Sequence, residues 1–275
     1  MIINVTWVLF IFFKRFSITM RLNYSEQGVG DPVFLIHGLF GSLSNLGNLA
    51  RALAPSYRVI SVDLRNHGDS PHHSEMSLLS MAQDLVELMD HLSIASAYFV
   101  GHSLGGKVAM QLAMSEASRF KSLVVVDIAP VKYIDNNSNI INNLYDLSKV
   151  DIKDRKIADS FLSEQGVEPS VRAFLLKNLR RNTAGNFELK ININAIKANY
   201  ESHLSVAPMG DVCTAPCLFL KGENSDYIEQ QHLPIIQSIF PKSSVKTIEA
   251  VGHWLHAEKP ELFNQIVLQF IREIS

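Results

Sequence analysis

Short apolar runs alternate with amphipathic segments along most of this chain. The runs Val33–Ile36, Tyr57–Val62 and Leu123–Val126 have the length of strands, and the last is rich in β-branched residues. Such a run is typical of a central strand that is buried on both faces. Between the strands, residues 78–92 repeat apolar positions at helical spacing. This alternation predicts an α/β domain with a mostly parallel central sheet and helices on both faces.

The alternation stops between residues 131 and 211, where we find no convincing strand. Three segments of this stretch have the pattern of short helices: 140–147, 152–162 and 171–179. About eighty residues are too many for a loop without structure of its own. We therefore expect a helical cap here, inserted between two strands of the sheet, which resumes at Cys217–Leu220 and again at Val245–Ile248.

The stretch Gly101-His102-Ser103-Leu104-Gly105 lies where an expected strand meets an expected helix. This is the setting in which G-x-S-x-G forms a nucleophile elbow. The serine of such an elbow has a strained backbone, and only small residues two before and two after it let strand and helix approach closely. Because glycine and serine are also common in loops, the pentapeptide alone is a weak signal. Ser103 is the candidate nucleophile.

A serine hydroxyl needs a base within hydrogen-bond reach and a third group that orients the base. His253 follows the last expected strand in a tight turn, at the edge where open α/β sheets place their sites. His203 falls in the insertion and His232 in a surface helix, so we expect both to be solvated. His256 completes H-x-x-H with His253, but no carboxylate or third ligand accompanies the pair, and we expect no metal site.

Two carboxylates compete for the role of the third group. In enzymes that have a nucleophile elbow, the third group is most often an Asp that lies three residues after a glycine following the penultimate strand. Here that glycine is Gly222, the expected position holds Ser225, and Asp226 is displaced by one residue. The alternative is Asp127, which ends the valine run directly after the elbow unit. We favour Asp127 and keep Asp226 as the alternative.

The oxyanion that forms during attack on an acyl carbonyl needs backbone N–H donors. Leu104 follows the nucleophile and supplies one. We expect the other from Leu39, in the loop after the Val33–Ile36 strand, where Gly38 and Gly41 permit an unusual backbone. This loop matches neither G-x-G-x-x-G nor a P-loop, so nothing here predicts a phosphate site.

From Met20 to its end the chain resembles the α/β hydrolases, and among them the small esterases of the YbfF type. The matching strings lie at 37–50, 62–71, 81–85, 101–107, 124–133, 174–179 and 252–260, and include RNHG and GHWLHAEKP. The resemblance implies the α/β-hydrolase fold with a helical cap after the sixth strand, and a Ser–Asp–His hydrolase acting on acyl esters. It also favours Asp127, because DIAP is retained while the usual later Asp is missing.

The composition of the chain bears on the number of domains, on nucleic-acid binding and on the cellular location. A chain of 275 residues with 47% apolar residues suits one domain, over residues 20–275, with an insertion at about 131–211. A net charge of −2 without a long basic run excludes a nucleic-acid footprint. Cys213 and Cys217 cannot form a disulfide framework, which favours a reducing, cytoplasmic location.

Residues 1–19 match nothing in the family. The segment is apolar but too short to span a bilayer, and it lacks the features of a secretory signal. It is a weak anchor, an unrecognised targeting segment, or translated upstream sequence before a start at Met20, and we favour the last. No stable membrane span is expected.

Together these features predict a carboxylic-ester hydrolase without metal or cofactor. Ser103, His253 and Asp127 form the triad, and the amides of Leu39 and Leu104 hold the oxyanion. Small-molecule acyl esters are the expected substrates, with acyl thioesters as a further class. The alternatives on the same scaffold are a carbon–carbon bond hydrolase, an acyl-CoA thioesterase, and a non-catalytic ligand-binding homologue.

Overall fold

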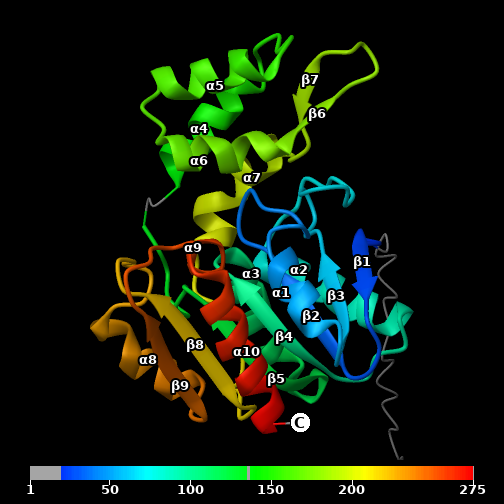
Figure 1. Cartoon of the computed structure of the whole chain (residues 1–275), viewed down its shortest axis with the longest axis vertical. Helices are drawn as coiled ribbons and strands as arrows, with labels where there is room; N and C mark the ends of the chain where they lie inside the picture. The colour runs from blue at the N-terminus through cyan, green and yellow to red at the C-terminus, as the bar shows by residue number, and fades with distance from the viewer. Residues whose placement is uncertain (1–19, 135–136, 275) are drawn as a thin grey trace, which may run out of the picture.

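The computed structural model describes residues 20–134 and 137–274, so the extension over residues 1–19 lies outside the described part. Its centre is a seven-stranded sheet with the order β1-β3-β2-β4-β5-β8-β9 (Figure 1). The strands are β1 Tyr24–Gln27, β2 Pro32–Ile36, β3 Arg58–Val62, β4 Ala97–His102, β5 Phe120–Val126, β8 Cys217–Gly222 and β9 Ser243–Ile248. Only β1 pairs antiparallel with its neighbour among these strands. The predicted mostly parallel α/β sheet is confirmed.

Helices cover both faces of the sheet because successive strand residues point to opposite sides. In β2, Phe34 and Ile36 belong to the core that the sheet shares with α2 (Leu78–His91) and α3 (Leu104–Ser115). Val33 and Leu35 face the other core. That second core is completed by helices α1, Gly47–Leu53, and α10, Pro260–Ile274. Within the described residues, no helix is long and apolar enough to cross a membrane.

The described residues 131–134 and 137–211, called the insertion below, connect β5 to β8, and their helices lie beyond the carboxyl ends of the strands (Figure 1). Five described strands precede the insertion, so it follows the fifth strand of the described chain and not the expected sixth. Its helical elements are α4 Ser138–Leu147, α5 Arg155–Glu164, α6 Pro169–Leu175, a 3₁₀ turn Leu176–Asn178, α7 Ile193–Asn199 and a π-helical turn Tyr200–Leu204. The three helices expected from the sequence are present as α4, α5 and α6, with shifted ends.

The expectation that the insertion holds no strand is wrong. β6 (Leu179–Arg181) and β7 (Phe187–Leu189) pair as an antiparallel hairpin. Each strand has only three residues, which is too short to produce a readable alternation of apolar and polar positions. The turn between them contains Gly185 at φ 87°, a conformation that glycine adopts readily.

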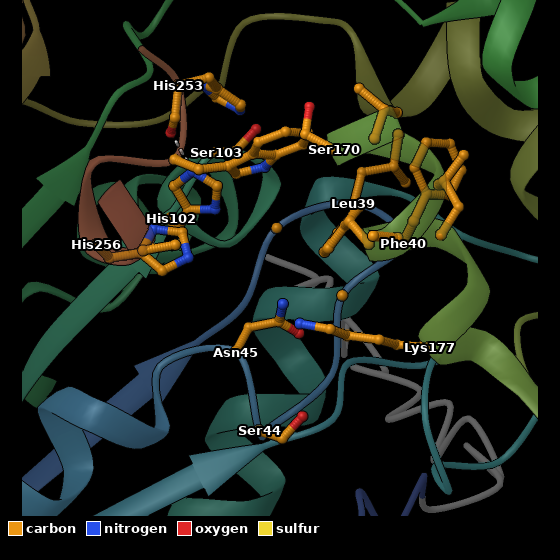
Figure 2. A pocket seen from close by; sticks show the side chains of 18 of the residues that line it. Leu39, Phe40, Ser44, Asn45, His102, Ser103, Ser170, Lys177, His253 and His256 are labelled. Carbon is orange, nitrogen blue, oxygen red and sulfur yellow. Dashed lines mark hydrogen bonds between the residues drawn. The ribbon is translucent and has the colours of Figure 1, made fainter. Parts of the chain in front are cut away.

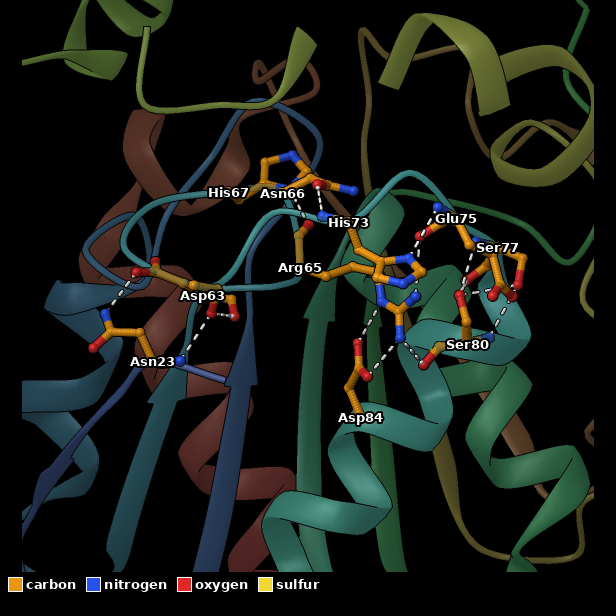
Figure 3. Close-up of polar contacts among 11 residues, drawn as sticks. Asn23, Asp63, Arg65, Asn66, His67, His73, Glu75, Ser77, Ser80 and Asp84 are labelled. Atoms are coloured by element: carbon orange, nitrogen blue, oxygen red, sulfur yellow. Dashed lines mark hydrogen bonds and ion pairs between the residues drawn. The ribbon is translucent and has the colours of Figure 1, made fainter. Parts of the chain in front are cut away.

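The loop after β3 is held by a buried ion pair. Arg65 donates from Nε and Nη2 to the two carboxylate oxygens of Asp84 on α2, both at 2.6 Å (Figure 3). The two side chains are 8% and 3% exposed. Arg65 also donates to the carbonyls of Glu75 and Ser80. This one side chain therefore fixes the loop that carries the RNHG string against α2.

Removing the carboxylate of Asp84 leaves a buried guanidinium without its counter-charge. We therefore expect Asp84→Ala to lower the free energy of unfolding by about 3–5 kcal/mol. The control is Asp90→Ala on the same helix, where Asp90 pairs with Arg119 but is 58% exposed. That change should cost below about 1 kcal/mol. Equal losses for the two variants in chemical denaturation would contradict the role given to the buried pair.

Candidate active site

Ser103 occupies a strained turn between β4 and α3. Its backbone has φ 52° and ψ −117°, and its N–H donates to the carbonyl of Val126 at 2.9 Å. The flanking positions require glycine because neighbouring backbone atoms leave no room for a Cβ. A Cβ on Gly101 would overlap the carbonyl of Gly105, and one on Gly105 would overlap the carbonyl of Ile36. The structure thus has the elbow that the pentapeptide predicts, with the serine at its apex.

His253 and Asp127 meet at the same edge of the sheet. Asp127 follows β5 and is fully buried, with its own backbone at φ 53°. His253, in the turn after β9, donates from Nδ1 to Asp127 Oδ2 at 2.8 Å. Figure 2 shows the His253 side chain beside Ser103, and both line one cavity. The structure brings together the three side chains singled out in the sequence.

Two further donors hold the Asp127 carboxylate. The amide of Gly222, at the end of β8, donates to Oδ1 at 3.0 Å, and the Ser225 hydroxyl donates to Oδ2. The alternative acid, Asp226, is exposed and borders a surface groove. Sequence reasoning treated Ser225 only as a missing carboxylate. Its position three residues after Gly222 was the signal that it faces the histidine, but the bond to Asp127 is visible only in three dimensions.

The loop after β2 carries Leu39 in a tight turn. The carbonyl of Gly38 accepts from the amide of Gly41 at 3.0 Å and from His37 Nδ1 at 2.7 Å. In a trans peptide the N–H points opposite to the C=O. The Leu39 N–H is therefore directed away from these two groups, and Leu39 itself borders the cavity at Ser103. Leu104 follows Ser103 as the first residue of α3.

Phe40, the next residue of this turn, is clamped from two sides. Its φ of 61° is strained for an aromatic residue. Its N–H donates to Nε2 of His67, from the loop after β3, at 3.2 Å. Its carbonyl accepts from Nδ2 of Asn178 at 2.8 Å, and Asn178 belongs to the insertion. The turn that presents Leu39 thus depends on contacts with two segments that are distant in sequence.

The histidines behind this turn are held neutral. Burial lowers the pKa of His37 to about 4 and that of His67 to about 3. Each therefore keeps Nε2 as an acceptor: for the Leu64 amide at 3.0 Å in His37, and for the Phe40 amide in His67. Because neither ring gains a proton at neutral pH, both hydrogen bonds persist there.

A second group of rings surrounds His253. The Tyr227 ring stacks on His253 with centroids 4.1 Å apart. His102 lies between His253 and His256 and donates from Nε2 to the His253 carbonyl at 2.9 Å. Burial lowers the pKa of His256 to about 4, and its Nδ1 has no hydrogen-bond partner within the described chain. These contacts fix the backbone and the ring of His253.

The cavity over Ser103 has a volume of about 520 Å³. The insertion contributes the apolar side chains of Ile140, Val171 and Phe174. It also contributes polar ones, among them Ser170 and Lys177 (Figure 2). The segment around the start of α1 contributes polar ones: Ser44, Asn45 and Asn48. A ligand with an apolar part and a hydrogen-bonding part suits this space.

Metal ligation finds no support at the other histidines. His203 is exposed in the π-helical turn, and His232 is half-buried beside Tyr133. Over residues 20–134 and 137–274, the structure holds no group of three His, Cys, Asp or Glu side chains that could bind a metal ion.

The elbow follows β4, the fourth strand in this sheet order, and the acid and the histidine follow later in the chain. This arrangement defines the class of α/β hydrolases. Comparison with known proteins agrees. A family model described as "alpha/beta hydrolase fold" matches residues 31–260. The chain belongs to the α/β-hydrolase family.

Comparison with individual proteins shows which members of the family this chain is similar to. The chain is 35% identical to esterase YbfF of Escherichia coli K12, over 92% of this chain and 100% of the relative. It is 36% identical to the sn-1-specific diacylglycerol lipase ABHD11 of Mus musculus, over 87% of this chain and 80% of the relative. A solved marine microorganism esterase is 38% identical with a TM-score of 0.87, covering 91% of this chain and 99% of its own. The chain therefore groups with the family's serine esterases and lipases, as the sequence predicts.

The buried neutral histidines make stability depend on pH. The pKa of His256 is about 4 in the folded state but near 6.5 when unfolded. Below pH 6.5 the unfolded chain binds a proton that the folded chain does not, so the free energy of unfolding decreases as the pH is lowered. Between pH 6.5 and 5, we expect His256→Phe to reduce the slope of the free energy of unfolding against pH by up to about 1.4 kcal/mol per pH unit. Denaturation at several pH values measures this, with His203→Gln as an exposed control. An unchanged slope in His256→Phe would contradict the assignment.

Proposed function

We propose that this protein is a carboxylic-ester hydrolase that works through an acyl-enzyme on Ser103. The observation that carries the proposal is the hydrogen bond from His253 Nδ1 to the buried Asp127 carboxylate. It leaves Nε2 of the imidazole as the base for the serine hydroxyl, which is the tautomer that such a triad requires. The esterases and lipases among the relatives support the reaction class.

The reaction has two halves. His253 takes the proton from Ser103 Oγ as this oxygen attacks the acyl carbonyl, and the amides of Leu39 and Leu104 hold the oxyanion. The tetrahedral intermediate collapses, His253 protonates the leaving alcohol, and the acyl group stays on Ser103. Water, deprotonated by His253, then attacks the acyl-enzyme and releases the carboxylic acid. The Asp127 carboxylate accepts from Nδ1 of His253 and stabilises the imidazolium at each step.

The same steps apply to acyl thioesters, in which a thiol replaces the leaving alcohol, and we include them in the proposed substrate class. A non-catalytic role is disfavoured because its only sequence support was the missing carboxylate at Ser225. That position holds a donor to Asp127 instead. We further propose that the insertion acts as a cap that limits the substrates admitted, and that the protein works in the cytoplasm.

The triad assignment predicts a defined pattern of lost activity toward a p-nitrophenyl ester. Ser103→Ala and His253→Ala should each abolish turnover, and Asp127→Asn should lower kcat by roughly 10³–10⁴-fold, because the imidazole loses its orienting acceptor. Asp226→Asn is the matched control and should keep kcat within about twofold. If Asp226→Asn loses activity while Asp127→Asn keeps it, the acid is assigned wrongly.

Ser225 should support the triad without being required. Its hydroxyl donates to Oδ2 of Asp127, the same oxygen that accepts from Nδ1 of His253, so its loss leaves the buried carboxylate with one donor fewer to hold it in place. We expect Ser225→Ala to lower kcat by about tenfold, far less than Asp127→Asn does. Ser225→Thr keeps the hydroxyl and should retain kcat within about twofold. An unchanged kcat in Ser225→Ala would refute this role.

A further inference from the structure

A second, smaller cavity of about 30 Å³ lies against the nucleophile. It shares Leu39, Ser103, Asn137 and Tyr227 with the large cavity, so the two spaces meet at the proposed reaction centre. The small cavity has walls of its own, from the start of α3, the segment after β5, and the π-helical turn of the insertion. These walls include the apolar side chains of Leu104, Ile128 and Leu204, and they also include Lys107, Tyr133, Tyr200 and Ser205.

The two cavities differ in whether the proposed catalytic base, His253, borders them. His253 borders the large cavity, and it is absent from the described residues that border the small one. In the proposed reaction His253 must protonate the leaving alcohol, so the alcohol has to extend on the side of His253. The acyl chain leaves the carbonyl carbon in a different direction from the alcohol. Of the two described cavities that border Ser103, the small one is the one that His253 does not border.

We propose that the small cavity is the acyl-binding site and restricts the enzyme to esters of short acyl groups, with the large cavity holding the alcohol. One water needs roughly 10–15 Å³ measured in this way, so about 30 Å³ holds two or three non-hydrogen atoms. The methyl of an acetyl group, with one such atom, and the ethyl part of a propionyl group, with two, therefore fit, and the three-atom chain of a butanoyl group is at the limit. This inference rests on the proposed function, because it assumes attack by Ser103.

The walls of the small cavity are braced. Nζ of the buried Lys107, on α3, donates to the carbonyls of Ser205 and Val206, both at 2.7 Å. Asn137 Nδ2 donates to the Tyr200 hydroxyl at 3.0 Å. These bonds tie the insertion to the helix that begins at the elbow. A longer acyl chain would have to displace the braced residues, so the cavity does not widen at low cost.

Two bulky side chains of the π-helical turn border this space. The amide of Ser205 donates to the carbonyl of Tyr200, five residues earlier, at 2.9 Å. Such turns are frequent at functional sites. Tyr200 and Leu204, at the two ends of this turn, are 6% and 3% exposed and both border the small cavity.

The test compares kcat/KM over p-nitrophenyl esters from acetyl to octanoyl. For the wild type we expect the highest value with acetyl or propionyl and a fall of at least 100-fold by octanoyl. Leu204→Ala should raise kcat/KM for hexanoyl by at least tenfold. Ile128→Val, a milder enlargement that preserves folding, should raise it for butanoyl by severalfold. The matched control, Val171→Ala, enlarges the large cavity and should leave the acyl order unchanged.

A second series uses acetate esters of alcohols of increasing length. Here Val171→Ala should change the preference for alcohol length, and Leu204→Ala should leave that preference unchanged. Turnover that depends on Ser103 but is fastest with octanoyl would overturn the acyl-site proposal and leave the hydrolase proposal standing. So would an acyl order that shifts in Val171→Ala and not in Leu204→Ala. Absence of turnover for every ester would overturn both.

Discussion

The hydrogen bond between His253 and Asp127 joins parts of the chain that are 126 residues apart, and the site depends on it. Asp127 follows β5, while His253 follows β9 at the edge of the sheet. A fully buried carboxylate is costly unless its oxygens are satisfied. Here the amide of Gly222, the Ser225 hydroxyl and the His253 imidazole supply three donors. The bonds that stabilise the buried charge are thus the same bonds that orient the base.

The turn that presents the Leu39 amide is also held by hydrogen bonds from segments that are distant in sequence. The strained Phe40 is held through its N–H by the neutral His67 and through its carbonyl by Asn178. His67 lies in the loop that the Arg65–Asp84 pair anchors to α2. The insertion therefore contributes to the geometry of the Leu39 turn as well as to the walls of both cavities. Changes in the insertion are expected to act on catalysis as well as on substrate choice.

The sequence predicted the parts of this structure that depend on local pattern. The alternation of runs such as Leu123–Val126 with helical segments specifies the sheet, and the small residues around Ser103 specify the elbow. Contacts between distant segments could not be predicted in this way. The bond of Ser225 to Asp127 spans 98 residues and that of Asn178 to Phe40 spans 138. The β6–β7 hairpin was missed because its strands are too short to show a period, and the small cavity because it is built from three separated segments.

The central claim is that Ser103 is the activated nucleophile of a working triad. Labelling with a fluorophosphonate, followed by peptide mapping, tests this most directly, because the reagent forms a stable bond only with a serine that a base activates. The account predicts one adduct, on the peptide that contains Ser103, and none in Ser103→Ala. An unlabelled wild-type protein, or an adduct on a different residue, would contradict it.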